Sequence, residues 1–331
     1  MSLRTPYLMF IGDAADQLAA KTAQGVVDWR PEWCLGQFKL PGCNADLGLK
    51  DMTLEEAAEA GVKTLVIGVA NRGGIISDVW SDTFVKAMEL GMDIASGLHN
   101  KLGDVPAIQA AADTHGRALF DVRHPTKEFS VASGKPRSGN RLLAVGTDCS
   151  LGKMYTTLAL WKGMLARGMK ADFRATGQTG IFITGEGVSV DAIIADFISG
   201  AVEELAPTND ADHWDLVEGQ GSLFHPSYAG VSLGLLHGAQ ASHLVMCHQP
   251  GRPHMRGIPH QQLPSLEDCI ALNERCARLT APDAKVVALS FNTSKMSDAE
   301  AEDCLKSHAD KFGMPCVDPV RIGVDAILDI L

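Results

Sequence analysis

The most constraining feature of the sequence is one continuous stretch, Leu-Leu-Ala-Val-Gly-Thr-Asp-Cys-Ser-Leu-Gly-Lys-Met-Tyr-Thr-Thr, at residues 142–157. Its apolar start predicts a buried parallel strand, a glycine-containing turn follows, and residues 154–166 have helical periodicity. In a phosphate-binding loop of this order, glycines let backbone N–H groups converge on phosphate oxygens, and the helix N-terminus adds positive charge. We therefore predict a phosphate site built from one run of residues: Gly146, Thr147, Asp148, Cys149, Ser150, Leu151, Gly152, Lys153, Met154, Tyr155 and Thr156.

Two departures from the usual form of such a loop limit this interpretation. Five residues separate Gly146 from Gly152, and Met154 stands where Ser or Thr would ligate Mg²⁺. The longer loop resembles that of dethiobiotin synthetase and the cobyrinic acid amidases, in which the extra residue is expected. The methionine leaves the metal ligand open, with Thr156 and Thr157 close enough in sequence to contribute a hydroxyl. An ordinary strand–turn–helix joint with a chance Gly-Lys pair is the alternative.

Composition limits the classes of protein to consider. The chain has 331 residues, 46% of them hydrophobic, which suits two globular domains. A net charge of −11 argues against nonspecific nucleic-acid binding. The eight cysteines form no C-x-x-C pair, so we predict free cytoplasmic thiols without a metal site. The apolar run 7–12 is too short for a signal peptide or membrane span, and a homodimer or larger homo-oligomer is the default.

Residues 1–135 are predicted to form a Rossmann-like domain, because strands and helices alternate. Expected strands cover 7–12, 33–40, 64–69, 93–96 and 117–122, and expected helices cover 14–25, 53–61, 79–90 and 105–114. No G-x-G-x-x-G motif occurs, so a nicotinamide dinucleotide is not favoured. Arg72, in a loop that follows a strand, is either an anion contact or a solvated arginine.

Residues 136–331 are predicted to form a second α/β domain, of P-loop NTPase type. The polar, turn-rich segment 125–140 marks the boundary. Further strands are expected at 170–175, 214–217, 242–246 and 285–291, and helices at 188–205, 267–278, 299–312 and 323–331. The segments 218–226 and 247–264 are expected as loops.

Polar residues follow several of the strands in this second domain. Glu218 ends one strand and leads into Gly219, Gln220, Gly221 and Ser222, whose amides are suited to an oxyanion. This run resembles the Val-Glu-Gly-Ala-Gly-Gly segment of dethiobiotin synthetase. Asn292 follows another strand and either meets a purine, as the resemblance implies, or caps the next turn.

Anion-binding and basic side chains lie in the same loops. Arg174 leads into a Thr-Gly-Gln-Thr-Gly turn that contains Gln178, and Arg252 and Arg256 lie in a long proline-rich loop. Guanidinium groups suit the carboxylates of a substrate. His225 is the candidate general base, against the alternative of a structural histidine.

Three motifs read together resemble the D-glutamate N-acetyltransferase family over nearly the whole chain: the Gly-Thr-Asp-Cys-Ser-Leu-Gly-Lys-Met loop, the Val-Glu-Gly-Gln-Gly-Ser-Leu-Phe-His-Pro run and the Cys-His-Gln-Pro-Gly-Arg-Pro loop. The resemblance implies acetyl transfer from acetyl-CoA to the amine of D-glutamate, in D-amino-acid catabolism. It assigns no catalytic residue, so we infer His225 or Glu218 as the base and an arginine as the carboxylate clamp.

Two other classes of function stay open at this point. An ATP/Mg-dependent carboxylate-activating ligase or kinase of the dethiobiotin synthetase type would use Lys153, Glu218 and Asp148 to bind MgATP. A nonenzymatic nucleotide sensor would bind nucleotide tightly without turnover.

Overall fold

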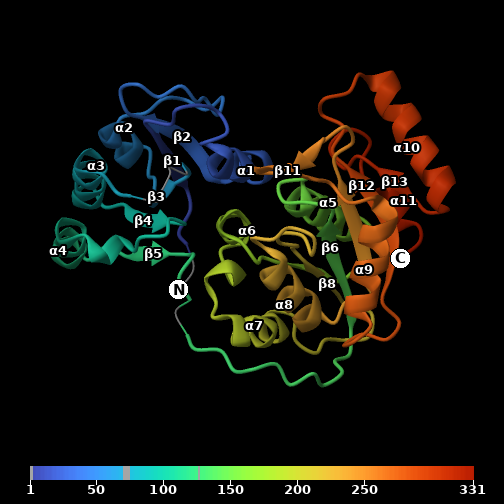
Figure 1. Cartoon of the computed structure of the whole chain (residues 1–331). Helices are drawn as coiled ribbons and strands as arrows, with labels where there is room; N and C mark the ends of the chain where they lie inside the picture. Colours follow the sequence, from blue (N-terminus) through green and yellow to red (C-terminus); the bar gives the residue numbers. More distant parts are fainter. Residues whose placement is uncertain (1–2, 70–74, 126) are drawn as a thin grey trace. The chain divides into compact units, whose positions relative to one another are not determined.

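Two all-parallel sheets organise the chain, each in its own unit (Figure 1). The computed structural model describes residues 3–69, 75–125 and 127–331. The first unit comprises residues 1–126 together with 177–192, and the second comprises 127–176 and 193–331. The segment 177–192 therefore lies in the N-terminal unit although it follows the first strands of the second unit in sequence.

The first unit contains a five-stranded sheet in the order β2-β1-β3-β4-β5. Its strands are β1 (Tyr7–Gly12), β2 (Cys34–Lys39), β3 (Thr64–Ile67), β4 (Asp93–Ser96) and β5 (Leu119–Asp121). Its helices are α1 (Lys21–Trp29), α2 (Leu54–Glu59), α3 (Asp78–Glu89), α4 (Pro106–His115) and α6 (Gln178–Thr184). Every residue of β1 and β3 is buried, as expected of strands inside a parallel sheet.

Local sequence signals explain where several of these elements begin. The Thr53 hydroxyl accepts the N–H of Glu56 while the Glu56 carboxylate accepts the N–H of Thr53, and this capping box starts α2. The expected helix 14–25 begins later, at Lys21, after a series of turns. These turns follow β1 directly and form one wall of a pocket at the carboxyl edge of the sheet.

The second unit contains a six-stranded sheet in the order β13-β12-β9-β6-β8-β7. Its strands are β6 (Asn140–Gly146), β7 (Ala171–Arg174), β8 (Trp214–Val217), β9 (His243–His248), β12 (Lys285–Phe291) and β13 (Cys316–Val317). Its helices are α5 (Lys153–Ala166), α7 (Ile198–Leu205), α8 (Ala229–Ala239), α9 (Leu266–Ala277), α10 (Asp298–Phe312) and α11 (Asp325–Leu328). The core packs α5 against the central strands through Leu142, Leu160 and Val245, and α11 contacts α5 and the edge strand β13.

Two expectations for residues 188–264 were wrong, and one helix was not expected. The expected helix 188–205 is two short 3₁₀ turns followed by α7, which begins only at Ile198. The segment 229–239, for which no helix was expected, forms α8, which packs against α7. The segment 247–264, expected as a loop, contains an antiparallel hairpin of β10 (His254–Met255) and β11 (Ile258–Gln262).

Within the described residues, no helix is both long and apolar enough to cross a membrane.

Candidate functional site

The phosphate loop predicted from the sequence connects β6 to α5 in the second unit. Gly152, the residue before α5, has a φ of +101°, a conformation that glycine adopts without steric cost. Lys153 is the first residue of the helix, and its buried ammonium donates to the carbonyl oxygen of Asp148 at 2.9 Å. Burial lowers the pKa of this lysine, and nearby Cys247, Cys149 and Asp148 oppose the effect. The lysine is therefore held against the loop itself.

The carboxylate of Asp148 is the centre of the loop's hydrogen bonds. One oxygen accepts the backbone N–H of Cys149 at 2.7 Å. The other accepts the guanidinium of Arg252 at 2.7 Å and the backbone N–H of Arg256 at 2.9 Å. Burial raises the pKa of Asp148, but the hydrogen bonds from Arg252, Arg256 and Cys149 outweigh it and hold the pKa below its usual range. Asp148 thus stays ionised while fully buried.

Arg252 fastens the proline-rich segment to the phosphate loop. Besides Asp148, its guanidinium donates to the carbonyl oxygens of Cys149 at 2.9 Å and Ser150 at 3.0 Å. The side chain of Gln249 accepts a further N–H from it at 3.0 Å. Such a set of bonds uses the planar fork that lysine lacks. Arg252 is therefore positioned to hold the shape of the loop.

The other predicted clamp arginines of the second unit differ in their partners. Arg174, at the end of β7, donates to Asp215 at 2.7 Å and to Asp172 at 3.0 Å, so its guanidinium is already paired. In the described part of the chain, the Arg256 guanidinium has no hydrogen-bond or ion-pair partner, although its backbone N–H bonds Asp148. Of the arginines in this unit that were expected to bind substrate, Arg256 therefore has a guanidinium available beside the phosphate loop.

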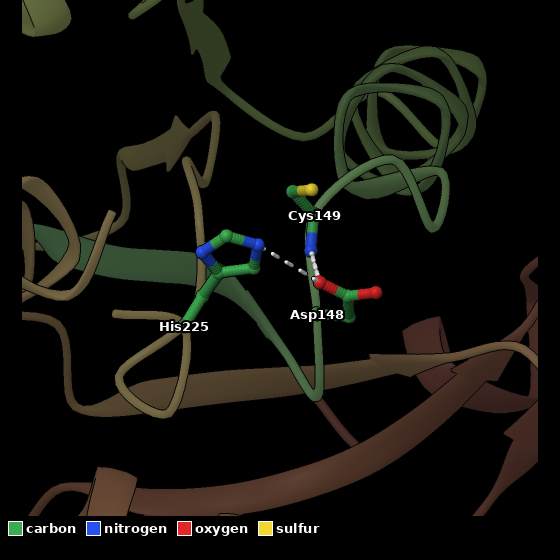
Figure 2. Close-up of side chains that lie close together, drawn as sticks. All are labelled: Asp148, Cys149 and His225. Carbon is green, nitrogen blue, oxygen red and sulfur yellow. Dashed lines mark hydrogen bonds and ion pairs between the residues drawn. The ribbon is translucent and has the colours of Figure 1, made fainter. Parts of the chain in front are cut away.

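His225 lies beside Asp148 and is almost completely buried, with 2% of its surface exposed. In Figure 2 the dashed lines from the His225 ring and from the Cys149 backbone meet at the same Asp148 oxygen, the histidine at 4.0 Å. Nδ1 accepts the N–H of Ser227 at 3.2 Å, and Nε2 lies 3.1 Å from the carbonyl oxygen of Arg256. These partners place the ring proton on Nε2 and engage the lone pair of Nδ1.

Glu218 follows β8 and is also buried. Its carboxylate accepts the N–H of Thr176 at 2.9 Å, and its backbone carbonyl accepts the Thr176 hydroxyl at 2.7 Å. The next residue lies so close to the phosphate loop that a methyl group at Gly219 would sit 1.6 Å from the Ala144 carbonyl oxygen and 3.0 Å from the Lys153 side chain. Glycine is therefore required at position 219. The sheet brings together the phosphate loop after β6 and the glycine-rich run after β8.

The remaining residues of the glycine-rich run form the turn after Gly219. Gln220 donates its side-chain N–H to the Thr176 hydroxyl at 3.2 Å. Gly221 has a φ of +61°, and the buried Ser222 hydroxyl accepts the N–H of Phe224 at 3.3 Å. One local hydrogen bond and one bond to Thr176, after β7, therefore hold the shape of the run.

The hydroxyls that follow Met154 face the interior. Thr156 donates to the carbonyl oxygen of Gly152 at 3.1 Å, and Thr157 donates to that of Lys153 at 2.8 Å. Both threonines are at most 1% exposed. In this arrangement neither hydroxyl replaces the missing Mg²⁺ ligand.

Two groups of three side chains in the described residues place metal-ligand atoms within 4.8 Å of one another. They are Asp148 with Cys149 and His225, and Asp172 with His213 and Asp215. Arg252 pairs with the first group and Arg174 with the second. A guanidinium therefore already pairs with a carboxylate of each group. Burial raises the pKa of the Cys149 thiol, and the Asp148 charge adds to this.

Other predicted residues have separate environments. Asn292 accepts the N–H of Ser294 at 3.1 Å, the turn-capping arrangement named as its alternative role. Gln178 is the first residue of α6 in the first unit, and Arg72 lies outside the described residues. Leu151 is buried against Ala144.

The structure also adds residues that the sequence alone did not single out. The Thr147 hydroxyl lies 3.0 Å from Nδ1 of His248, which ends β9. Burial, with smaller contributions from His308 and Arg252, lowers the pKa of His248 to about 4. Gln249 is the second addition, because it orients Arg252. Both sit in the Cys-His-Gln-Pro motif, whose spacing alone does not reveal their partners.

Comparison with known proteins places the chain in a family. A domain of unknown function (DUF1611_C), described as a P-loop domain, matches residues 130–328, and the Rossmann-like domain DUF1611_N matches residues 38–125. The chain is 55% identical over 329 residues to a D-glutamate N-acetyltransferase from Tritonibacter scottomollicae, covering 99% of both chains. It is 50% identical over 328 residues to a D-glutamate N-acetyltransferase from Pseudoalteromonas sp, again covering 99% of both.

A solved structure agrees with these matches. The crystal structure of a DUF1611 family protein from Anabaena variabilis superposes with a TM-score of 0.88 at 31% identity, covering 98% of each chain. The α/β fold class with Rossmann-like and P-loop parts, predicted from the sequence, is confirmed, and so is the family resemblance. The chain belongs to the DUF1611 family and is a relative of the proteins named D-glutamate N-acetyltransferase.

Proposed function

We propose that this protein is a D-glutamate N-acetyltransferase that takes its acetyl group from acetyl-CoA. The observation that carries the proposal is full-length identity of 55% and 50% to two proteins with that name. The reaction joins the neutral amine nitrogen of D-glutamate to the thioester carbonyl carbon and breaks the bond from that carbon to sulfur. The base takes the amine proton and passes it to the sulfur, so coenzyme A leaves as the thiol. It would serve D-amino-acid catabolism.

The phosphate loop would hold the phosphates of coenzyme A without breaking a phosphate bond. Lys153 supplies a cation, and the backbone N–H groups at the start of α5 supply donors. Arg252 supports this role indirectly by fixing the loop through Asp148. Loss of the Mg²⁺-ligating residue at Met154, with Thr156 turned inward, fits a loop that binds phosphates but transfers none.

The acceptor needs a carboxylate clamp and a base. Arg256 suits the clamp because its guanidinium has no partner among the described residues. The Gly219–Gly221 amides would stabilise the oxyanion of the tetrahedral intermediate. Glu218 ranks before His225 as the base, because a carboxylate has more lone pairs than the one that accepts the Thr176 N–H, whereas the single basic lone pair of His225, on Nδ1, accepts the Ser227 N–H. His225 then has a positioning role, because its ring lies between Asp148 of the phosphate loop and the carbonyl oxygen of Arg256 in the proline-rich segment.

The proposal also covers the location of the protein in the cell and its oligomeric state. All eight cysteines are free thiols, which supports a reducing, cytoplasmic location. We expect a homodimer or larger homo-oligomer, the commonest state of soluble enzymes. In sequence, the proposed domains are residues 1–135, the Rossmann-like domain, and residues 136–331, the domain of P-loop NTPase type.

The test is to incubate the protein with acetyl-CoA and a panel of D- and L-amino acids while following free thiol, with ATP consumption measured in parallel. Thiol release that depends on D-glutamate, without ATP consumption, is the expected result. ATP and Mg²⁺ consumption without thiol release would instead identify a ligase or kinase of the dethiobiotin synthetase type.

A further inference from the structure

The backbone N–H groups of the glycine-rich run after β8, residues 218–222, differ from those of the strands beside it. Among the described residues, the N–H groups of Gly219, Gln220, Gly221 and Ser222 have no hydrogen-bond acceptor. Gly219 and Ser222 are nevertheless buried. Buried N–H groups are nearly always paired in folded proteins, so these two indicate that a ligand supplies their acceptor. Successive N–H groups of this kind suit an anionic oxygen.

Thr176 fixes the first half of the run. It lies just after β7, and β7 and β8 are neighbouring parallel strands, so the residues that follow them lie side by side. The Thr176 hydroxyl donates to the carbonyl oxygen of Glu218 at 2.7 Å and accepts the side-chain N–H of Gln220 at 3.2 Å. Thr176 is fully buried, so water does not compete for these bonds. One hydroxyl therefore holds the residues on both sides of Gly219.

Ser232, in the first turn of α8, fixes the second half. Its hydroxyl donates to the carbonyl oxygen of Gln220 at 2.8 Å and lies 3.1 Å from the carbonyl oxygen of Tyr228. A methyl group at Gly221 would lie 2.5 Å from the Ser232 hydroxyl oxygen, so the backbone of the run lies directly against the helix. The run is therefore held from α8 as well as from the end of β7.

The run also has a fixed place beside the phosphate loop, because Gly219 lies against the Ala144 carbonyl group and the Lys153 side chain. Donors that are already in place stabilise a developing oxyanion most effectively, since nothing has to reorganise during the reaction. We propose that Thr176 and Ser232 are positioning residues, which hold the N–H groups of the run for the oxyanion of acetyl transfer. This role rests on the proposed function, and both residues act through the run.

Two anionic oxygens suit these N–H groups, the oxyanion and a phosphate oxygen of coenzyme A. The phosphate loop has its own N–H groups at the start of α5 and the ammonium of Lys153 for the phosphates, so we infer the oxyanion. The two differ in kinetics. The oxyanion exists only during the reaction, so displacing its donors lowers kcat and leaves binding unchanged. A phosphate is bound throughout, so displacing its donors would weaken the binding of coenzyme A.

Variants that lack one hydroxyl test the proposal. Thr176→Val keeps the shape of the side chain and removes both hydroxyl bonds, and Ser232→Ala removes the bond to Gln220. Each should lower kcat by about 10–10²-fold, with the KM for D-glutamate and the affinity for coenzyme A unchanged. Thr176→Ser keeps the hydroxyl and should keep most of the wild-type turnover.

Ser199→Ala is the matched control. The Ser199 hydroxyl also donates to a carbonyl oxygen of α8, that of Gly234 at 2.8 Å, which lies outside the run. Its loss should lower stability without changing kcat. Equal losses of kcat in Ser199→Ala and Ser232→Ala would show that any loosening of α8 slows the reaction, and would overturn the role of Ser232.

A measurement without substrate separates this role from the proposed function. In ¹⁵N NMR relaxation, the amides of Gly219, Gln220 and Gly221 should have order parameters of about 0.85 in the wild type and lower values in Thr176→Val and Ser232→Ala. Wild-type kcat and order parameters in both variants would overturn the proposal, as would weaker coenzyme A binding at unchanged kcat. If the wild-type protein releases no thiol with D-glutamate, the proposed function is wrong, and the relaxation data alone decide whether the two residues position the run.

Discussion

The guanidinium of Arg252 donates to the fully buried carboxylate of Asp148 at 2.7 Å and so ties a segment after β9 to the phosphate loop after β6. The two residues are 104 positions apart in sequence. Because Asp148 is buried, removing its ion-pair partner leaves a buried carboxylate with only the backbone N–H groups of Cys149 and Arg256 to compensate its charge. This pair is therefore a structural element of the loop as well as a source of charge.

A double-mutant cycle tests that relationship. Arg252→Gln should lower the free energy of unfolding by about 3 kcal/mol or more, because a buried carboxylate loses its partner. Adding Asp148→Asn should recover part of the loss, with a coupling energy of about 1–3 kcal/mol measured by denaturant unfolding. Additive effects, with normal stability of Arg252→Gln alone, would show that Arg252 serves the substrate only.

Lys153→Ala should weaken binding of the phosphorylated donor by about 1.5–3 kcal/mol, because a charge-assisted contact is lost. Calorimetry with coenzyme A measures this directly. Lys170→Ala is the control, since Lys170 pairs with Asp210 and Asp212 on the surface of the same unit. Equal affinity of wild type and Lys153→Ala would contradict the phosphate-loop interpretation.

The identity of the base can be read from pH–rate profiles. Glu218→Gln still accepts the Thr176 N–H but cannot take a proton, so turnover should fall by about 10²–10⁴ with donor affinity little changed. His225→Asn should lower turnover less and keep the acidic limb of the profile. Loss of the acidic limb in His225→Asn alone would return the role of base to His225.

Chelation tests the absence of a metal step. Acyl transfer from acetyl-CoA has no γ-phosphate to neutralise, so EDTA should leave turnover unchanged. Activity that collapses with EDTA and returns with Mg²⁺ would favour the ATP-dependent alternative.

The lowered pKa of His248 predicts how the stability of the folded protein depends on pH. Its pKa is about 4 in the folded protein and about 6.5 when unperturbed, so the unfolded chain binds more protons between these values. Stability linked to His248 is therefore complete above about pH 6.5 and is lost as the pH falls toward 4. Between pH 7 and pH 4.5, the unfolding free energy of His248→Gln should fall by about 1–3 kcal/mol less than that of the wild type, as measured by denaturant unfolding at both pH values. Identical pH dependence in the variant would show that His248 does not carry it.

Much of the fold was predictable because strong local signals agree with the tertiary structure. β1 is a continuous apolar run, β12 is apolar from Val286 to Leu289, and Thr53 with Glu56 encodes the start of α2. Helix α8 escaped prediction because Ala-Gly-Val-Ser-Leu-Gly-Leu-Leu-His-Gly-Ala is apolar or small on nearly every side, without an amphipathic period. Its glycines instead allow close packing, since a methyl group at Gly238 would lie 2.3 Å from the Ser199 carbonyl oxygen.

The site was predictable only as a set of loops. Lys153 and Glu218 follow strands, and the sheet brings their loops together, as Gly219 shows. The partners of Arg252 and Arg174 were not predictable, because they depend on residues far away in sequence or across β7 and β8. The tertiary structure decides which arginine has a guanidinium without a partner among the described residues. The spacing of the arginines in the sequence carries no information about this.

The assignment of residues 177–192 to the first unit means that the chain passes between the units three times, after residues 126, 176 and 192. Helix α6 packs on α1, and the Gln178 side chain lies directly against the backbone of Gly97. A fragment that stops at residue 126 would therefore lack a piece of its own core. A chimera that exchanges the first unit between two relatives must therefore exchange residues 1–126 and 177–192 together.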